Sequence, residues 1–199
     1  MRPGQAALSH AGLRQRFATP LLARFYDRPT PVVARALLGR WLVVRSGRSY
    51  RAARIVETEA YVADDPANHA DRGPTRRNAA MFGPPGTLYV YPIHQVHCAN
   101  AVTRPGQAVL LRAAEPVSPG LASLSGPGRL CRSLGISGED DRSSLLRDRV
   151  RIVVGDATPH SVVRTTRVGI SRAVERPLRF LWAGHPAVSS PRPWARRRA

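Results

Sequence analysis

Residues 54–61 read RIVETEAY, and the alternation of side chains in this stretch decides the fold. Successive side chains of a β-strand point to opposite faces of the sheet. Six residues then divide between two faces, with Val56, Thr58 and Ala60 on one and Glu57, Glu59 and Tyr61 on the other. Two carboxylates and a phenol on one face indicate a functional site. The alternative is an exposed strand face whose glutamates pair with neighbouring arginines.

The flanking sequence predicts further strands. Runs rich in Val, Ile, Thr and aromatic residues, bounded by Gly, Pro or Ser, are typical of strands. Such runs are Trp41–Arg45, Arg51–Tyr61, Thr87–Tyr91, Ala108–Ala113, Val150–Val154, Thr166–Ile170 and Leu178–Trp182. Ser46 and Gly47 separate the first two runs and predict a hairpin turn between them.

Two short helices are predicted from their start and stop signals. Thr30 is expected to cap a helix that begins at Pro31, and Gly39 stands where this helix should end. A second helix is expected over Gly128–Leu134, with Gly135 as its C-terminal stop.

Strands outnumber helices in this pattern, and hairpins and loops join them instead of regular βαβ units. The pattern predicts an α+β fold, a single domain with a curved, mostly antiparallel sheet and flanking short helices. We expect the domain to cover residues 20–185. A flexible N-terminal segment, 1–19, would precede it, and a basic flexible tail, 186–199, would follow it.

Charge is the strongest compositional signal. The formal net charge of +18 favours nucleic acid as the partner, although an anionic membrane surface or an RNA assembly would fit the same charge. All 31 basic residues are arginine, so no lysine side chain is available to form a Schiff base. No apolar stretch reaches the roughly 18–20 residues of a membrane span, and two cysteines are too few for a disulfide framework. We expect a cytoplasmic or nucleoid protein, or a nuclear one in a eukaryote, that does not bind a membrane.

Residues 87–91, TLYVY, repeat the alternation, so Tyr89 and Tyr91 share a face. A tyrosine ring can stack on a nucleic-acid base, a contact worth roughly 1–3 kcal/mol. The alternative is that both rings are half-buried packing residues of the sheet.

Potential metal ligands are scattered through the same region: Asp64, Asp65, His69, Asp71, His94, His97, Cys98 and Asn100. No Cys or His pair among them has a recognised ligand spacing, so neither a metal nor another cofactor is predicted. A metal-dependent phosphodiesterase using His94, His97 and the acids of Asp64–Asp71 stays open as an alternative.

A series of longer blocks follows one order along the chain. The blocks are RIVETEAY at 54–61, His69, TRRNAAMF at 75–82, GTLYVY at 86–91, HCAN at 97–100, LLRAAEP at 110–116, GPGRLCRSLGI at 126–136, TRVGIS at 166–171 and RPLRF at 176–180. In this order they resemble the alkyladenine (3-methyladenine) DNA glycosylase family. The resemblance covers about residues 20–182 and is far more specific than any single motif.

The resemblance implies a monofunctional DNA glycosylase, expected to be a monomer. It would flip alkylated or deaminated purines out of double-stranded DNA, excise them by hydrolysis and leave an abasic site. By this likeness Glu59 is the general base and Arg112 helps to position the water. The base pocket would contain Tyr61, His69, Tyr91 and, at its floor, Asn100, while Thr75, Arg76, Arg77, Asn78, Gly128 and Arg129 would lie near the DNA backbone.

One segment departs from the family pattern. Family members carry Tyr-Gly-Met after the GTLYVY strand, and that tyrosine fills the gap left by the flipped base. This chain has Pro-Ile-His-Gln-Val at 92–96, one residue shorter before HCAN. His94 is the first candidate for the wedge and Ile93 the second, so lesion range or affinity should differ from the family norm.

A non-catalytic nucleic-acid binder or damage sensor is the leading alternative to an enzyme. Such a protein would explain the charge and the paired tyrosines. It would leave the two glutamates on the aromatic strand face without a role.

Overall fold

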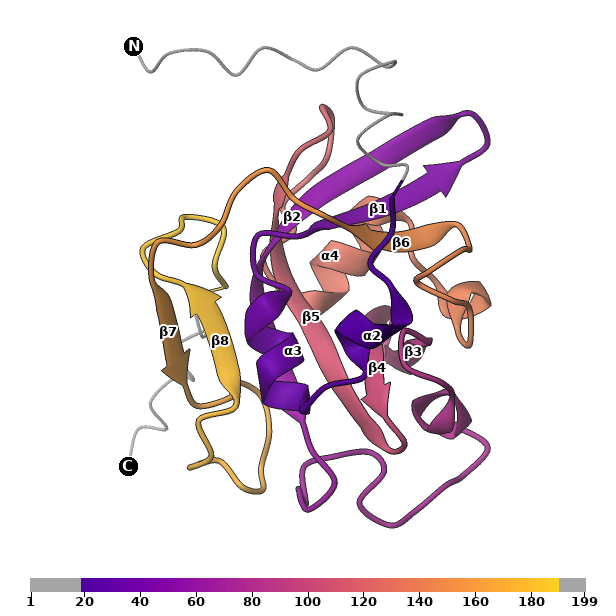
Figure 1. Cartoon of the computed structure of the whole chain (residues 1–199), viewed down its shortest axis with the longest axis vertical. Coiled ribbons are helices and arrows are strands. Elements are labelled where there is room, and N and C mark those ends of the chain that lie inside the picture. The colour runs from indigo at the N-terminus through magenta and orange to yellow at the C-terminus, as the bar shows by residue number, and fades with distance from the viewer. Residues whose placement is uncertain (1–18, 190–199) are drawn as a thin grey trace.

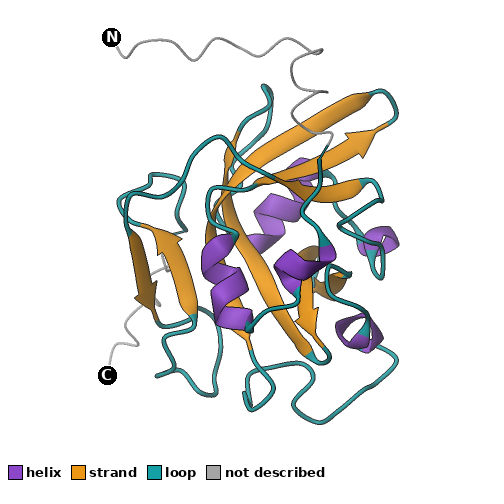
Figure 2. Ribbon diagram, in the orientation of Figure 1, coloured by secondary structure: helices purple, strands orange, loops and turns teal. Residues whose placement is uncertain are grey.

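The computed structural model describes residues 19–189 and consists of a curled antiparallel sheet with short helices (Figures 1 and 2). The strands are β1 Trp41–Ser46, β2 Ser49–Tyr61, β3 Leu88–Ile93, β4 Val96–Arg104, β5 Gln107–Pro116, β6 Val150–Val153, β7 Val162–Thr165 and β8 Arg179–Trp182. The helices are α2 Ala23–Tyr26, α3 Thr30–Ala36 and α4 Pro127–Leu134, with 3₁₀ turns η1 Ala79–Phe82 and η2 Gly138–Asp140. The predicted α+β fold is confirmed.

Strand β2 is the centre of the sheet. The strand order is β3-β4-β5-β2-β1-β6, and β8 also pairs with β2 and carries β7. The first half of β2 pairs with β1, with Trp41 opposite Arg54, whereas its last part pairs with β8, with Glu59 opposite Arg179. Strand β5 runs along the other edge of β2, so Glu59 lies between two hydrogen-bonded neighbours.

The alternation of side chains separates the core from a second, polar face. The main apolar cluster takes alternate residues of the central strands and joins them to all three helices. From β3, β4 and β5 it takes Leu88 and Val90, Ala99 and Ala101, and Val109 and Leu111. The residues between them face a cavity instead: Tyr89 and Tyr91, Cys98 and Asn100, and Leu110 and Arg112. One pattern of alternating residues therefore builds both the core and the site.

A β-bulge in β2 changes the predicted alternation. The register with β5 shifts between Ile55 and Glu57 and again between Glu57 and Thr58. Ile55 therefore joins the main core, while Val56 packs in a separate small cluster with Ala113 and Trp182. The prediction that Val56 shares a face with Thr58 and Ala60 is wrong, because a bulge adds one residue and reverses the phase before it.

The first helix also differs from its prediction at its start. Pro29 is the N-cap of α3, and Thr30 is its first residue. The Thr30 hydroxyl does not cap the helix; it bonds the hydroxyl of Thr103 at 2.8 Å and donates to Gln107 at 2.8 Å. This buried threonine thus ties α3 to the β4–β5 hairpin.

Helix α4 packs closely on β4. A Cβ atom at Gly128 would lie 2.8 Å from Cγ2 of Val96, so only glycine allows this approach. The helix ends at Gly135, which has a left-handed backbone, as predicted.

One predicted strand is wrong, and one strand was missed. Thr166–Ile170 is a loop, and the strand in this region is β7, which ends at Thr165. Strand β4 was not predicted, because its polar HCAN segment does not read as an apolar run.

The predicted flexible segments at the two ends of the chain are only partly covered by the structure. Residues 1–18 and 190–199 lie outside the described residues, and with them most of the two expected flexible segments. Ser189, inside the expected tail, is buried and bonded to Glu57.

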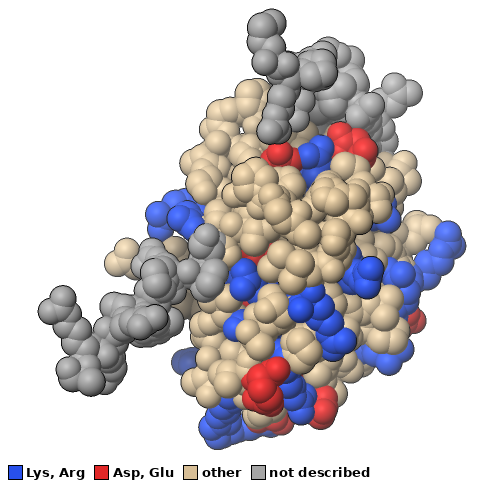
Figure 3. Space-filling model, turned by 90° about the vertical axis from the view of Figure 1, so that its left-hand side faces the viewer, with Lys and Arg blue, Asp and Glu red and all other residues tan. Residues whose placement is uncertain are grey.

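Arginines are spread over the described surface. On the face that carries β7 and β8, they occur at the sides, across the middle and along the bottom, with carboxylates at the bottom and near the top (Figure 3). Among the helices of residues 19–189, none combines the length and apolar character needed to cross a membrane.

Candidate active site

A cavity of about 540 Å³ opens on the polar face of the sheet. Its walls come from β2, β3, β4 and β5, from the loop of residues 66–69 and from the loop of residues 168–172. The volume falls in the range of roughly 300–1,000 Å³ that is typical of small-molecule sites. The cavity therefore has room for a single purine base.

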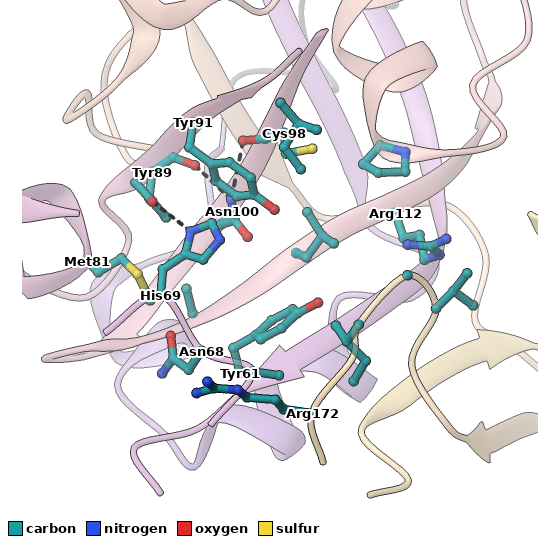
Figure 4. Close-up of a pocket in the computed structure, with 18 of the residues that line it drawn as sticks. Tyr61, Asn68, His69, Met81, Tyr89, Tyr91, Cys98, Asn100, Arg112 and Arg172 are labelled. Atoms are coloured by element: carbon teal, nitrogen blue, oxygen red, sulfur yellow. Dashed lines mark hydrogen bonds between the residues drawn. The ribbon is translucent and has the colours of Figure 1, made fainter. Parts of the chain in front are cut away.

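Three aromatic rings form one wall of the cavity. His69 and Tyr91 meet edge to face, with ring centroids 4.4 Å apart, and Tyr89 lies 5.4 Å from Tyr91. The His69 Nδ1 and the Tyr89 hydroxyl are hydrogen-bonded at 3.0 Å. Tyr61 lies across the cavity from this wall (Figure 4). A flat ligand can therefore be held between Tyr61 and the pair of His69 and Tyr91.

Burial among these rings changes their acid–base behaviour. His69 is exposed overall, but its ring packs on Tyr89 and Tyr91, and desolvation there lowers its pKa. Desolvation likewise raises the pKa of Tyr61 and Tyr91. The wall is therefore neutral at physiological pH.

Asn100 lies at the inner end of the wall, almost fully buried on β4. Its amide nitrogen donates to the backbone oxygens of Tyr89 at 3.1 Å and of Cys98 at 3.3 Å (Figure 4). These two bonds fix the amide, so the oxygen is the atom that Asn100 can present to a ligand.

The Glu59 carboxylate lies directly behind the cavity. It is fully buried, and it accepts hydrogen bonds from the Val168 backbone N–H at 2.8 Å and from the Tyr61 hydroxyl at 3.1 Å. The Arg112 Nε lies 3.5 Å from the same carboxylate. Tyr61, Arg112 and Val168 all line the cavity, although Glu59 itself does not. The acid is therefore bonded directly to two groups that line the cavity.

Competing effects set the ionisation of Glu59. Burial raises the pKa of its carboxyl, and the nearby Glu57 adds to this rise. The Arg112 guanidinium and the hydrogen bonds from Val168 and Tyr61 oppose it. The pKa remains above its ordinary value, which is typical of carboxyl groups that transfer protons.

Glu57 shares the face of Glu59 but is excluded from the cavity. Its carboxylate bonds the Arg179 Nε at 2.6 Å and the Ser189 backbone N–H at 2.7 Å, and it lies 3.1 Å from the Arg112 Nε. The sequence predicted that both acids share one face of the strand, but it could not predict that only Glu59 lies next to the cavity. Arg179 and Ser189 lie 122 and 132 residues away along the chain.

The mouth of the cavity carries the two wedge candidates. They lie at the tip of the β3–β4 hairpin, where Ile93 is 42% exposed and also lines the cavity. His94 follows it with a left-handed backbone, φ +52°, and is exposed.

The residues predicted near the DNA backbone differ in accessibility. Thr75, Arg76, Arg77 and Arg129 are exposed, and Gly128 is half-buried against β4. Asn78 is buried, and its side-chain amide bonds the backbone of Thr75, His69 and Gly73. Its side chain therefore stabilises the loop of residues 69–78.

The sequence assigned three residues no role beside Glu59, and it named one of them, Asp65, only as a potential metal ligand. They are Val168, which bonds Glu59, and the buried pair of Asp65 and Arg167 beside Tyr61. The TRVGIS block was the only signal for the loop that contains two of them. Within residues 19–189, no three His, Cys, Asp or Glu side chains gather as ligands for a metal ion.

Comparisons with known proteins agree with one another. Residues 24–186 match the family model described as methylpurine-DNA glycosylase. A protein of Anaeromyxobacter dehalogenans strain 2CP-1 is 52% identical over 181 residues, which cover 86% of each chain. Another, from Rhizobium etli, is 41% identical and covers 94% of each chain, and one from Methanoculleus marisnigri is 44% identical over 85% of this chain and 98% of its own. All three are named "Putative 3-methyladenine DNA glycosylase".

Proposed function

The chain belongs to the methylpurine-DNA glycosylase family, and we propose that it flips damaged purines out of duplex DNA and hydrolyses their bond to the sugar. The observation that carries this proposal is the buried Glu59 carboxylate behind an aromatic cavity. A carboxylate in this position can act on the sugar of a base held by the rings.

Base flipping is the first step of the proposal. A base inside the duplex hides its glycosidic bond, so the nucleotide must leave the stack at a cost of a few kcal/mol. Stacking between Tyr61 and the rings of His69 and Tyr91 would offset part of this cost, at roughly 1–3 kcal/mol per stacked base. Purines made cationic by alkylation gain more, because tyrosine rings attract a positive charge.

Hydrolysis is the second step. The water oxygen attacks C1′ of the sugar, Glu59 takes the proton of the water, and the electron pair of the C1′–N9 bond leaves with the purine. The charge of Glu59 also stabilises the positive character that develops on the sugar. Both tasks require the ionised carboxylate. Arg112 supports this state, and we propose that it also orients the water.

The nature of the leaving purine decides how easily the bond breaks. A cationic alkylpurine departs as a neutral molecule, whereas a neutral deaminated purine must gain a proton as it leaves. We therefore propose alkylated purines as the fast substrates and deaminated purines as the slow ones. The absence of lysine excludes strand cleavage through a lysine Schiff base, so the product is an intact strand with an abasic site.

The substitution Glu59→Gln tests the catalytic assignment. On a duplex with one alkylpurine or one hypoxanthine, we expect the single-turnover release of free base to fall by about a hundredfold or more. Binding of the same duplex should persist, because Glu59 does not line the cavity. Glu139→Gln is the matched control, since this exposed glutamate on η2 lies outside the cavity lining. Retained turnover in Glu59→Gln would remove Glu59 as the base.

The same assay separates an enzyme from a damage sensor, the role that the net charge also permits. An enzyme releases free base from the lesion duplex and none from an undamaged duplex. Tight binding of the lesion duplex by the wild-type protein without any release of base would instead support the sensor.

A further inference from the structure

A fully buried ion pair lies beside the cavity. Arg167 donates from Nη2 to Asp65 Oδ1 at 2.9 Å and from Nη1 to Asp65 Oδ2, and both side chains are completely buried. Burying two charges is costly, so such a pair is weak evidence for a gain in stability. The Arg167 Nε is also buried without a hydrogen-bond partner among the described residues, which adds to the cost. The pair therefore calls for a role other than stability.

The pair joins the two loops that flank the cavity. Asp65 begins the turn whose next four residues, 66–69, line one side of the cavity and include His69. Its Oδ1 also accepts the Ala67 N–H at 3.1 Å. Arg167 directly precedes residues 168–172, which also line the cavity. Two bonds between these side chains thus fix the separation of the two loops.

Arg167 also contacts the strand that carries Glu59. Its Nη1 donates to the backbone oxygen of Ala60 at 3.2 Å, and its guanidinium carbon lies 4.7 Å from the centre of the Tyr61 ring. The next residue, Val168, donates the hydrogen bond at 2.8 Å to Glu59. Tyr61 donates the other, at 3.1 Å. Arg167 is therefore next to both groups that bond the carboxylate.

We propose that Asp65 and Arg167 are positioning residues, which hold the Val168 N–H and the Tyr61 hydroxyl against Glu59. This proposal rests on the proposed function, because it assigns the pair to the site of hydrolysis. Asp65 fixes the guanidinium through its two oxygens, the guanidinium fixes the loop and the tyrosine ring, and these fix the carboxylate. Neither residue of the pair lines the cavity.

Arg167→Lys is the sharpest test, because lysine keeps the positive charge but cannot form the planar two-bond contact. We expect the Val168 N–H to bond Glu59 less often, so that Glu59 loses a contact that favours its ionised form. The base must be ionised, so the acid limb of the pH–rate profile should move to higher pH. At neutral pH, single-turnover release should fall by about tenfold, the factor for one hydrogen bond to a charged group, while the Kd for lesion DNA changes little.

The charge retained in Arg167→Lys matters because several ionisable groups face Glu59. They are Glu57 and Tyr61 on β2, Cys98 on β4, Arg112 on β5, Arg167 on the loop and Arg179, the register partner of Glu59 on β8. None of these charges is removed by the substitution. An upward shift of the acid limb therefore reports the geometry of the contact.

Arg176→Lys is the matched control. Arg176 pairs with Asp64, the neighbour of Asp65, at 3.3 Å, but this pair is largely exposed. The same chemical change at this pair should alter neither the pH profile nor the rate. An effect equal to that of Arg167→Lys would show that the buried position is not what matters, and would overturn the proposal.

Amide hydrogen exchange gives a readout that needs no DNA. In Arg167→Lys, and in the nearly isosteric Asp65→Asn, exchange at Val168 should become about tenfold faster, while exchange in β4 and β5 stays as in the wild type. Unchanged exchange at Val168 together with an unchanged pH profile would overturn the proposal. Faster exchange throughout the sheet, with binding and release lost together, would identify a pair that only supports the fold and would overturn it as well. A wild-type protein that releases no base would refute the proposed function, and exchange at Val168 would still decide the role of the pair.

Discussion

At the scale of single residues, Glu57 and Glu59 show how position decides chemistry. Both are fully buried on β2, and both lie near the same Arg112 Nε. Glu57 is neutralised by a second arginine, Arg179, whereas Glu59 is bonded by an N–H and a phenol that line the cavity. Glu59 accepts two hydrogen bonds and Glu57 three, and this remaining acceptor capacity supports our proposal that Glu59 takes the proton of the water.

The raised pKa of Glu59 predicts a pH-dependent cost to stability. Burial makes the folded protein hold the proton of this carboxyl to a higher pH than the unfolded chain does. The ionised carboxylate therefore destabilises the fold above both pKa values. The cost vanishes below the unfolded pKa of about 4.3.

Glu59→Gln should remove this cost: the amide oxygen can still accept from the Val168 N–H, and the amide nitrogen can donate to the Tyr61 hydroxyl oxygen. We expect its Tm to exceed that of the wild type near about pH 8 and the difference to shrink as the pH falls towards about 4. Thermal unfolding across this range measures the difference. Glu139→Gln should show no such trend, and a constant offset in Glu59→Gln would contradict the assignment of the cost to ionisation.

At the scale of elements, the β3–β4 hairpin favours Ile93 over His94 as the group that fills the gap left by a flipped base. Ile93 is both exposed and part of the cavity lining, whereas His94 occupies the turn and does not line the cavity. We expect Ile93→Ala to slow single-turnover release by about five- to tenfold and His94→Ala to have a smaller effect. An aromatic side chain stacked on a base contributes roughly 1–3 kcal/mol, and we expect the aliphatic Ile93 to contribute only part of this energy. The reverse order of effects would assign the wedge to His94.

The contact of α4 with β4 makes a prediction about stability. An alanine side chain at 128 would lie 2.8 and 2.9 Å from Val96 atoms, so α4 would have to move away from the sheet. We expect Gly128→Ala to lower the free energy of unfolding by about 1–3 kcal/mol, the usual cost of overpacking, despite the better helix propensity of alanine. Denaturant unfolding measures the loss. Gly138→Ala is the control, because its new Cβ would lie at an ordinary 3.6 Å from His97.

The sequence predicted most elements but missed those whose form depends on distant partners. Alternation identified β2 and β3, and an apolar run at Ala108–Ala113 identified β5. The loop at 166–170 was predicted as a strand, but its Val168 N–H bonds a glutamate side chain and not a neighbouring strand. The bulge at Val56 escaped prediction because nothing local marks an extra residue in a strand.

At the scale of the whole molecule, the parts of the site that depend on distant residues could not be predicted either. The aromatic wall and Glu59 follow from alternation within two strands, together with the family resemblance. The ion pairs around it do not, because Arg112 pairs with Glu57 and Glu59, Arg179 with Glu57 and Arg167 with Asp65, from three separate parts of the chain. The family resemblance named Arg112, but in a chain with 31 arginines nothing in the sequence marked Arg167 or Arg179.

The large positive charge predicts how binding depends on salt. Each phosphate neutralised on duplex DNA releases counterions, so log K falls with log salt at a slope near −0.9 per contact. Arg76, Arg77 and Arg129 are exposed and belong to the segments predicted near the DNA backbone. Replacing any one of them with alanine should weaken binding to lesion and undamaged duplexes alike and reduce the slope by about one. Arg35→Ala is the control, because α3 packs on the core side of the sheet, away from the cavity. An equal change of slope in Arg35→Ala would mean that the net charge, and not a defined DNA-binding face, accounts for the affinity.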